Sequence, residues 1–227
     1  MNWIKDDTKR FRERPYFLDS EIDRECETMI TECLKSRNKT VFSPPLDTDT
    51  LNVLLEMHSA DVNLYADLEA TEGIGVEGVT EFQKGKKPKI SIDKRLSENE
   101  AFINRLRSTM AHELFHARFH LILWELYWLG KTKRVNCHKS HIIMAGKTDW
   151  YEWQAAYGSG AILMPRSALI GLVGAGSLVP EVSSEGQALI TLVSSNFQVS
   201  RDAARVRLTQ LKTLKGSPRP LVSTPGA

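Results

Sequence analysis

The stretch AHELFHA, residues 111–117, places His112 and His116 four residues apart with Glu113 between them. This is the H-E-x-x-H pattern. On a helix, side chains four residues apart lie on one face about 5 to 6 Å apart, so two neutral imidazoles can bind one Zn²⁺ ion. Glu113 follows His112 by about 100° around the helix, where its carboxylate can take a proton from a metal-bound water. The stretch therefore predicts two metal ligands and a general base.

The residues around this stretch extend the predicted helix in both directions. The segment SENE, residues 97–100, has the form of a capping box in which Ser97 caps the helix and Glu100 reaches back to the cap. No Pro or Gly follows until Gly130, which is typical of a helix end. The sequence thus predicts one long helix from Ser97 to Leu129. Its back face, opposite the two histidines, carries Ile103, Met110, Leu114 and Leu121.

A zinc site of this kind needs a third protein ligand from outside the two-histidine turn. His120 is excluded because it lies about 12 Å along the helix axis from His112, too far for one ion to bridge. Glu125 falls on the back face of the same helix. The remaining candidates lie further along the chain and are Cys137, His138, His141, Asp149 and Glu152.

A second motif, EWQAAYGSGAILMP, runs from Glu152 to the helix-breaking Pro165. Together with the H-E-x-x-H helix, it resembles the ImmA/IrrE metallopeptidase family, in which the glutamate that opens this segment is the third zinc ligand. The hairpin predicted before the helix and the pattern V-S-x-x-A-x-x-x-R-L at residues 199–208 are also similar to that family. The resemblance covers residues 50 to 212.

The resemblance implies a zincin-like core in which His112, His116 and Glu152 hold Zn²⁺ and Glu113 is catalytic. It leaves Mn²⁺ or another divalent ion open. It also implies the activity of a zinc endopeptidase that cleaves a specific helix-turn-helix repressor, bacterial or phage-encoded, and so derepresses stress or mobile-element genes. Cys137 remains an alternative ligand because thiolate is a strong zinc donor.

Three positions depart from the family pattern. Phe115 stands where Gly is usual between the histidines, and Ala156 and Gly158 stand where Asn and Phe are usual after the ligand glutamate. We expect the first change to crowd the helix near the metal and the second to remove a hydrogen bond behind a ligand.

Several other polar residues have expected roles near the motifs. Asp149 is expected to cap the helix that starts near Glu152, or to orient a ligand histidine. Something beyond the metal must stabilise the oxyanion of a peptidase intermediate. The candidates for that role are His138, His141 and Tyr157.

Composition excludes several classes of protein. The 227 residues include 30 basic and 28 acidic residues, and a net charge of +2 gives no general attraction to nucleic acid or anionic membranes. Three cysteines cannot form a disulfide framework and suit a reducing compartment. The charged N-terminus lacks the apolar region of a signal peptide, and the apolar runs are too short to span a bilayer. We expect a cytoplasmic protein with no membrane partner.

The rest of the chain predicts an α+β fold, with a mostly helical core and a small antiparallel sheet. Helices are expected at residues 20–34, where Cys26 and Cys33 lie on the buried side, and at 49–60. Strands are expected at 61–68, 79–82 and 90–92, and the edge at 79–83 is a hypothetical place for a substrate strand. The glycines of GIGVEG, residues 73–78, precede a strand rather than a helix, which indicates a turn and not a nucleotide loop.

The domain organisation predicted is a charged, loose N-terminal arm at 1–15, a metallopeptidase domain at 16–165, a C-terminal helical subdomain at 166–215 and a disordered tail at 216–227. The subdomain has the outline of a helix-turn-helix at 185–195 and 201–214. Direct DNA binding by its second helix is an alternative, but the basic residues lie right around that helix, which favours a packed pair. A regulator that binds a repressor without cleaving it is another alternative. The sequence indicates no oligomeric state.

Overall fold

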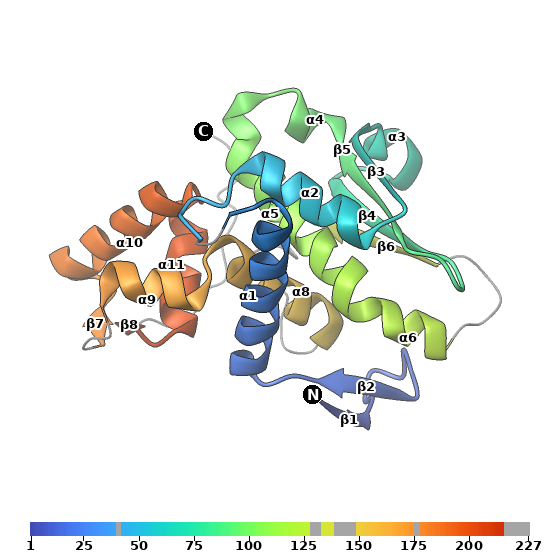
Figure 1. Ribbon diagram of the computed structural model, residues 1–227, viewed down its shortest axis with the longest axis horizontal. Helices are drawn as coiled ribbons and strands as arrows, with labels where there is room; N and C mark the ends of the chain where they lie inside the picture. The colour runs from blue at the N-terminus through green and yellow to red at the C-terminus, as the bar shows by residue number, and fades with distance from the viewer. Residues whose placement is uncertain (40–41, 128–132, 139–148, 175–177, 216–227) are drawn as a thin grey trace.

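The computed structural model describes residues 1–39, 42–127, 133–138, 149–174 and 178–215 (Figure 1). These residues form an α+β fold in which helices predominate, as predicted. In Figure 1, α5 runs through the middle of the molecule between a sheet at one end and the C-terminal helices at the other. The predicted tail at 216–227 lies outside the described residues.

The helical elements are α1 (Asp19–Ser36), α2 (Thr48–His58), α3 (Leu68–Glu72), α4 (Lys94–Ser97), η1 (Glu100–Phe102), α5 (Ile103–Phe115), η2 (His116–His120), α6 (Leu121–Leu126), α8 (Trp150–Leu163), α9 (Arg166–Val173), α10 (Ser184–Phe197) and α11 (Arg201–Gln210). The strands are β1 (Asn2–Lys5), β2 (Glu13–Tyr16), β3 (Asp61–Ala66), β4 (Val76–Phe82), β5 (Lys89–Asp93), β6 (Lys133–His138), β7 (Val179–Pro180) and β8 (Leu214–Lys215).

The prediction of one unbroken helix from Ser97 to Leu129 is wrong. Ser97 ends α4 instead of capping a helix, because its hydroxyl donates a hydrogen bond to the carbonyl oxygen of Leu64 in β3. Asn99 caps the short turn η1, and α5 begins only at Ile103. After Phe115 the helix widens into the π-helical turn η2 before α6 resumes the α-helical geometry. A π-turn inside a helix is frequently found at a functional site.

The small sheet is mixed rather than antiparallel, with the strand order β3-β5-β4-β6. β4 and β5 form the predicted antiparallel hairpin, but β3 pairs with β5 in parallel. The reason is α3, which carries the chain away after β3, so that β4 enters the sheet beyond β5. The glycine-rich segment 73–78 leads directly into β4, which confirms a turn, and Gly73 and Gly75 have the positive φ angles that glycine tolerates.

Residues 133–138 form a strand that the sequence did not predict. β6 pairs antiparallel with β4, with Thr80 opposite Val135 and Gly78 opposite Cys137. β4 therefore has a neighbour on both sides, so the hypothesis of a free substrate-binding edge at 79–83 is wrong. Among the described strands, the outer position on that side of the sheet belongs to β6.

The N-terminal residues are not a loose arm. β1 and β2 pair as an antiparallel hairpin, which lies below α6 in Figure 1. Its turn is held by Asp6, whose carboxylate accepts hydrogen bonds from the backbone amides of Thr8 and Phe11. The Phe11 ring packs against aromatic residues of α6 and α8, among them Trp124 and Trp150. Burial of this aromatic surface orders a segment whose charge had indicated a loose arm.

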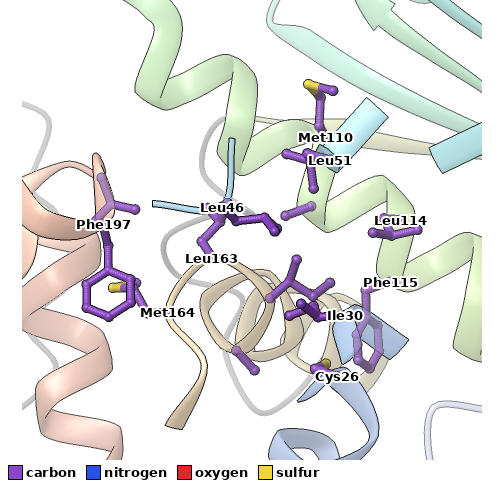
Figure 2. Close-up of a cluster of buried hydrophobic side chains, with 14 of the residues drawn as sticks. Cys26, Ile30, Leu46, Leu51, Met110, Leu114, Phe115, Leu163, Met164 and Phe197 are labelled. Atoms are coloured by element: carbon purple, nitrogen blue, oxygen red, sulfur yellow. The ribbon is translucent and has the colours of Figure 1, made fainter. Parts of the chain in front are cut away.

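One buried apolar cluster joins α1, α2, α5 and α8 to the C-terminal helices. Figure 2 shows Phe197, from the end of α10, beside Met164 at the end of α8. Arg107 strengthens this junction, because its buried guanidinium donates to the carbonyl oxygens of Leu46 and Gln198. Cys26 and Cys33 lie fully buried in α1, as predicted. Whether residues 166–215 form a separate subdomain remains a prediction.

In the described part of the chain, no single helix has both the length and the hydropathy that a membrane span needs. Only α8 and α9 together, which meet at a bend of 55°, have that length and hydropathy.

Candidate metal centre

Three side chains, one each from α5, η2 and α8, converge where α5 passes into η2. His112 comes from the last turn of α5, His116 opens η2, and Glu152 lies in the first turn of α8. His112 Nε2 lies 3.0 Å from His116 Nε2 and 3.1 Å from Glu152 Oε2. His116 Nε2 lies 3.6 Å from Glu152 Oε1. All three residues are buried, and this triad could hold a metal ion.

The spacing of the triad fits a tetrahedral ion. With ligand bonds of about 2.0 to 2.1 Å, two donors of a tetrahedral zinc site lie roughly 3.3 Å apart. The separations of 3.0 to 3.6 Å bracket this value, with Oε2 of Glu152 nearer to His112 and Oε1 nearer to His116, so either oxygen could serve as the third donor. Two imidazole nitrogens and one carboxylate oxygen also leave a fourth position, which is the arrangement of catalytic rather than structural zinc sites. The geometry does not identify the metal.

Local sequence explains why Glu152 reaches the two histidines. Asp149 is the N-cap of α8, and its carboxylate accepts a hydrogen bond from the backbone amide of Glu152. This confirms the predicted capping role and fixes Glu152 in the first helical turn. Pro165 follows the end of the helix, so α8 spans the second motif without interruption.

Glu113 lies against the sheet, next to the triad. Its carboxylate accepts a short hydrogen bond of 2.5 Å from the hydroxyl of Thr80 in β4. A Cβ atom on Gly78 would overlap the same carboxylate, so only glycine at that position lets β4 approach so closely. Complete burial raises the pKa of Glu113 to about 8, the Thr80 hydrogen bond lowers it and the nearby charge of Glu152 raises it further. A carboxyl group with a pKa near neutrality is suited to taking up and releasing a proton.

Cys137 is the alternative third ligand, and β6 brings it close to this centre. Donor atoms of His112, Glu113 and Cys137 lie within 4.8 Å of one another. That second group lacks His116, whereas Glu152 approaches both histidines. Burial also raises the pKa of the Cys137 thiol well above its usual value, which disfavours the thiolate before a metal binds. The geometry therefore favours Glu152 over Cys137.

His120 lies beside the triad, although it does not join it. The π-helical turn brings His120 Nδ1 to 2.8 Å from His116 Nδ1. On its other side, His120 Nε2 lies 3.0 Å from Oε1 of Gln154 in α8. Burial lowers the pKa of His120 well below its usual value. The four-residue spacing of His116 and His120 could have predicted this contact from the sequence. The contact was not predicted because His120 was considered only as a metal ligand.

The Tyr151 ring completes the packing around the histidines. It stacks on His116 at a centroid distance of 4.6 Å and on His120 at 4.0 Å. Its hydroxyl accepts a hydrogen bond from the indole of Trp124. No sequence pattern singled out Tyr151, although it directly precedes Glu152.

A surface cavity of about 250 Å³ reaches one member of the triad, Glu152. It lies between the N-terminal hairpin, α6, β6 and the start of α8. Its lining residues are Arg10, Trp124, Arg134, Val135, Asn136, Asp149 and Glu152. Because Glu152 is among them, a molecule that enters the cavity can contact Glu152, whereas neither histidine lines the cavity.

The residues proposed to stabilise an oxyanion have different positions. The Tyr157 hydroxyl donates to Asp23 of α1, and so it is not directed at the triad, which makes that assignment wrong. His138 ends β6, opposite Val76 of β4. His141 lies outside the described residues.

The departures at Phe115 and Gly158 compensate for each other. A Cβ atom on Gly158 would overlap the Phe115 ring, so the large side chain on α5 occupies the space left by the small residue on α8. The Phe115 ring fills the interface between α5 and α8, with its centroid 5.3 Å from that of the His120 ring. That Phe115 crowds the helix near the metal stays a prediction.

No protein-family model matches the chain, and no curated protein shows significant sequence similarity to it.

Proposed function

We propose that the protein is a zinc endopeptidase in which His112, His116 and Glu152 hold the ion and Glu113 is the general base. The observation that carries this proposal is the convergence of two imidazoles and a carboxylate within 3.6 Å inside the protein, where Glu152 also lines a surface cavity. A zincin-like core, built on α5, α8 and the sheet, and a helix-turn-helix-like pair, α10 and α11, are parts of the same proposal.

A bound divalent ion would polarise the scissile carbonyl and lower the pKa of a water molecule in the open position. Glu113 takes the proton of the attacking water on its carboxylate and then delivers it to the nitrogen of the leaving amine. Thr80 holds that carboxylate in place by donating to Oε2, which leaves Oε1 for the proton. Burial supports this transfer because it raises the pKa of Glu113 to about 8, close to neutral pH.

The substrate is proposed to bind as an extended chain along β6. Val135 and Asn136 of this strand line the cavity that reaches Glu152, and β6 is the outermost described strand on that side of the sheet. Extended peptides commonly add to a free sheet edge through main-chain hydrogen bonds. The proposed substrate-binding edge is therefore β6, the strand beside residues 79–83, and not residues 79–83 themselves.

The proposed substrate is a helix-turn-helix repressor, bacterial or phage-encoded, and this rests on the resemblance of the two motifs to the ImmA/IrrE family. The pairing of Phe115 with Gly158 supports the resemblance, because it accounts for two departures as one exchange of volume across α5 and α8. Cleavage would release the genes that the repressor holds silent.

Contacts of the C-terminal arginines do not favour the DNA-binding alternative. Arg207 is fully buried and pairs with Asp23 of α1. Arg205 is mostly buried near Glu181 and Asp202, and Arg201 donates to Thr191 and Gln187 of α10. These side chains hold α11 within the protein.

The test incubates the purified zinc-loaded protein with the repressor encoded beside its gene. Wild type is expected to cut the repressor, whereas Glu113→Gln keeps its zinc but loses cleavage. Glu125→Gln changes an exposed glutamate on α6 and should cleave like wild type. Cleavage by Glu113→Gln at the wild-type rate would overturn the proposal, and release of the repressor from DNA by that variant would favour regulation without proteolysis.

A further inference from the structure

We infer that His120 and Gln154 are positioning residues, which fix the tautomer of His116 through a hydrogen-bond relay that begins at the backbone of β2. The inference rests on the proposed metal centre and assigns roles to two residues outside the ligand triad. It concerns which nitrogen of His116 carries a proton before any ion is bound.

The relay has three hydrogen bonds in series. Gln154 Nε2 lies 3.0 Å from the carbonyl oxygen of Pro15, at the end of the N-terminal hairpin. Gln154 Oε1 lies 3.0 Å from His120 Nε2, and His120 Nδ1 lies 2.8 Å from His116 Nδ1. Gln154 is 1% exposed and both histidines are 0% exposed, so the protein supplies every partner in the series.

The Pro15 carbonyl, at the start of the series, determines which atom donates in each of the three hydrogen bonds. A backbone carbonyl only accepts hydrogen bonds, so Gln154 must turn its amide nitrogen to Pro15 and its oxygen to His120. That oxygen requires His120 to donate from Nε2, which leaves the lone pair of neutral His120 on Nδ1. His116 must then donate from Nδ1, and its own lone pair is left on Nε2.

His116 Nε2 is the atom that meets His112 and Glu152. Of the two neutral tautomers of imidazole, only the one with the proton on Nδ1 can bind a metal through Nε2. The relay therefore favours, before any ion binds, the His116 tautomer that can bind a metal through Nε2. The reverse arrangement would put a hydrogen where the ion must bind.

The Tyr151 ring restricts rotation of the two imidazoles in the relay. Its buried ring lies nearly parallel to both imidazoles, at 23° to His116 and 27° to His120. Rotation of either imidazole out of its plane would meet this ring. The hairpin is fixed in turn by Asp6, whose carboxylate accepts a hydrogen bond from the Trp150 indole at 2.9 Å. The carbonyl of Pro15 is thus held at the start of the series by contacts independent of the metal.

The direct test is ¹⁵N NMR of the imidazoles in the metal-free wild-type protein, because ring nitrogens with and without a proton differ in chemical shift. We expect a proton on Nδ1 of His116 and on Nε2 of His120. Observation of the opposite tautomer at either histidine would overturn the relay. This measurement needs neither zinc nor activity, so it remains decisive even if the protein proves not to be a peptidase.

A second test measures zinc affinity by competition with a chromogenic chelator. Gln154→Met removes the acceptor for His120 at nearly constant volume and should weaken zinc binding by about 10- to 100-fold, the usual effect of losing a partner behind a ligand histidine. Gln154→Glu keeps an acceptor for His120 but loses the amide that donates to the Pro15 carbonyl, so it should also bind zinc more weakly than wild type. Gln187→Met, on α10 and away from the triad, is the control for a Gln-to-Met change.

The outcomes separate the relay from the proposed function. Zinc affinity of folded Gln154→Met equal to that of wild type would overturn the relay and leave the peptidase proposal intact. Gln154→Glu binding zinc as tightly as wild type would also overturn it, because the donor to Pro15 that sets the direction of the relay would then be unnecessary. If wild type bound no zinc, the proposed function would fail, and the NMR measurement would decide the relay.

Discussion

Substitution of Glu113 by Gln should stabilise the metal-free protein, and more so as the pH rises. Glu113 is completely buried, and its pKa in the folded protein is about 8 rather than 4.5. Below pH 4.5 the folded and unfolded chains both hold the proton, and Glu113 adds no pH-dependent term to the free energy of unfolding. As the pH rises from 4.5 to 8, the unfolded chain releases its proton while the folded chain keeps it, so the free energy of unfolding falls.

The size of the effect follows from the two pKa values. Each pKa unit corresponds to about 1.4 kcal/mol, so the wild type loses on the order of 1 to 2 kcal/mol through Glu113 at pH 5.5 and on the order of 4 to 5 kcal/mol at pH 8.5. Gln cannot ionise and loses nothing. The stability difference between Glu113→Gln and wild type should therefore grow by about 3 kcal/mol between these two pH values. Titrating groups that do not interact with Glu113 cancel because both proteins contain them.

Urea unfolding in the presence of a chelator, at pH 5.5 and 8.5, measures this difference. Glu125→Gln, which alters an exposed carboxylate on α6, is the matched control and should show little change with pH. A Glu113→Gln difference that is the same at both pH values would refute the argument, because it would mean that Glu113 ionises as easily in the folded chain as in the unfolded one.

Three further predictions concern buried side chains. Gly158→Ala should destabilise the protein by about 1 to 3 kcal/mol in urea unfolding, because the new methyl group overlaps the Phe115 ring. Adding Phe115→Leu should restore part of this stability, and an equal loss with and without Phe115→Leu would contradict the pairing of the two residues. Asp23→Ala should cost about 3 to 5 kcal/mol by the same assay, because it leaves the buried Arg207 guanidinium without its carboxylate, and a cost below 1 kcal/mol would be inconsistent with that pair. Cys26, Cys33 and Cys137 should all resist a thiol reagent in the folded protein and react in urea, and rapid labelling of the folded chain would show that these buried thiols are accessible.

The centre could be predicted from the sequence because its geometry is local. His112 and His116 are four residues apart on one helix, and that spacing alone brings two imidazoles together. Glu152 was reached through the resemblance of a second motif, and the structure places its carboxylate beside both histidines. The roles of these side chains as ligands remain predictions.

The surroundings of the centre depend on contacts between distant parts of the chain. The strand β6 was missed because its charged residues outweighed the alternation that turns Val135 and Cys137 to one face. The N-terminal hairpin was missed because Phe11 becomes ordered only against the aromatic residues of α6 and α8. The sequence identifies Phe115 and Gly158 as two separate departures from the family pattern. Only the packing of α5 on α8 shows that the Phe115 ring occupies the space beside Gly158.

X-ray absorption spectroscopy of the zinc-loaded protein identifies the ligand atoms of the ion. We expect one zinc per chain, bound by imidazole nitrogen and carboxylate oxygen at about 2.0 to 2.2 Å, with no sulfur at about 2.3 Å. We also expect Glu152→Ala to lose zinc affinity and Cys137→Ser to keep it. A sulfur ligand in the spectrum, or undiminished zinc binding by Glu152→Ala, would contradict the triad of His112, His116 and Glu152.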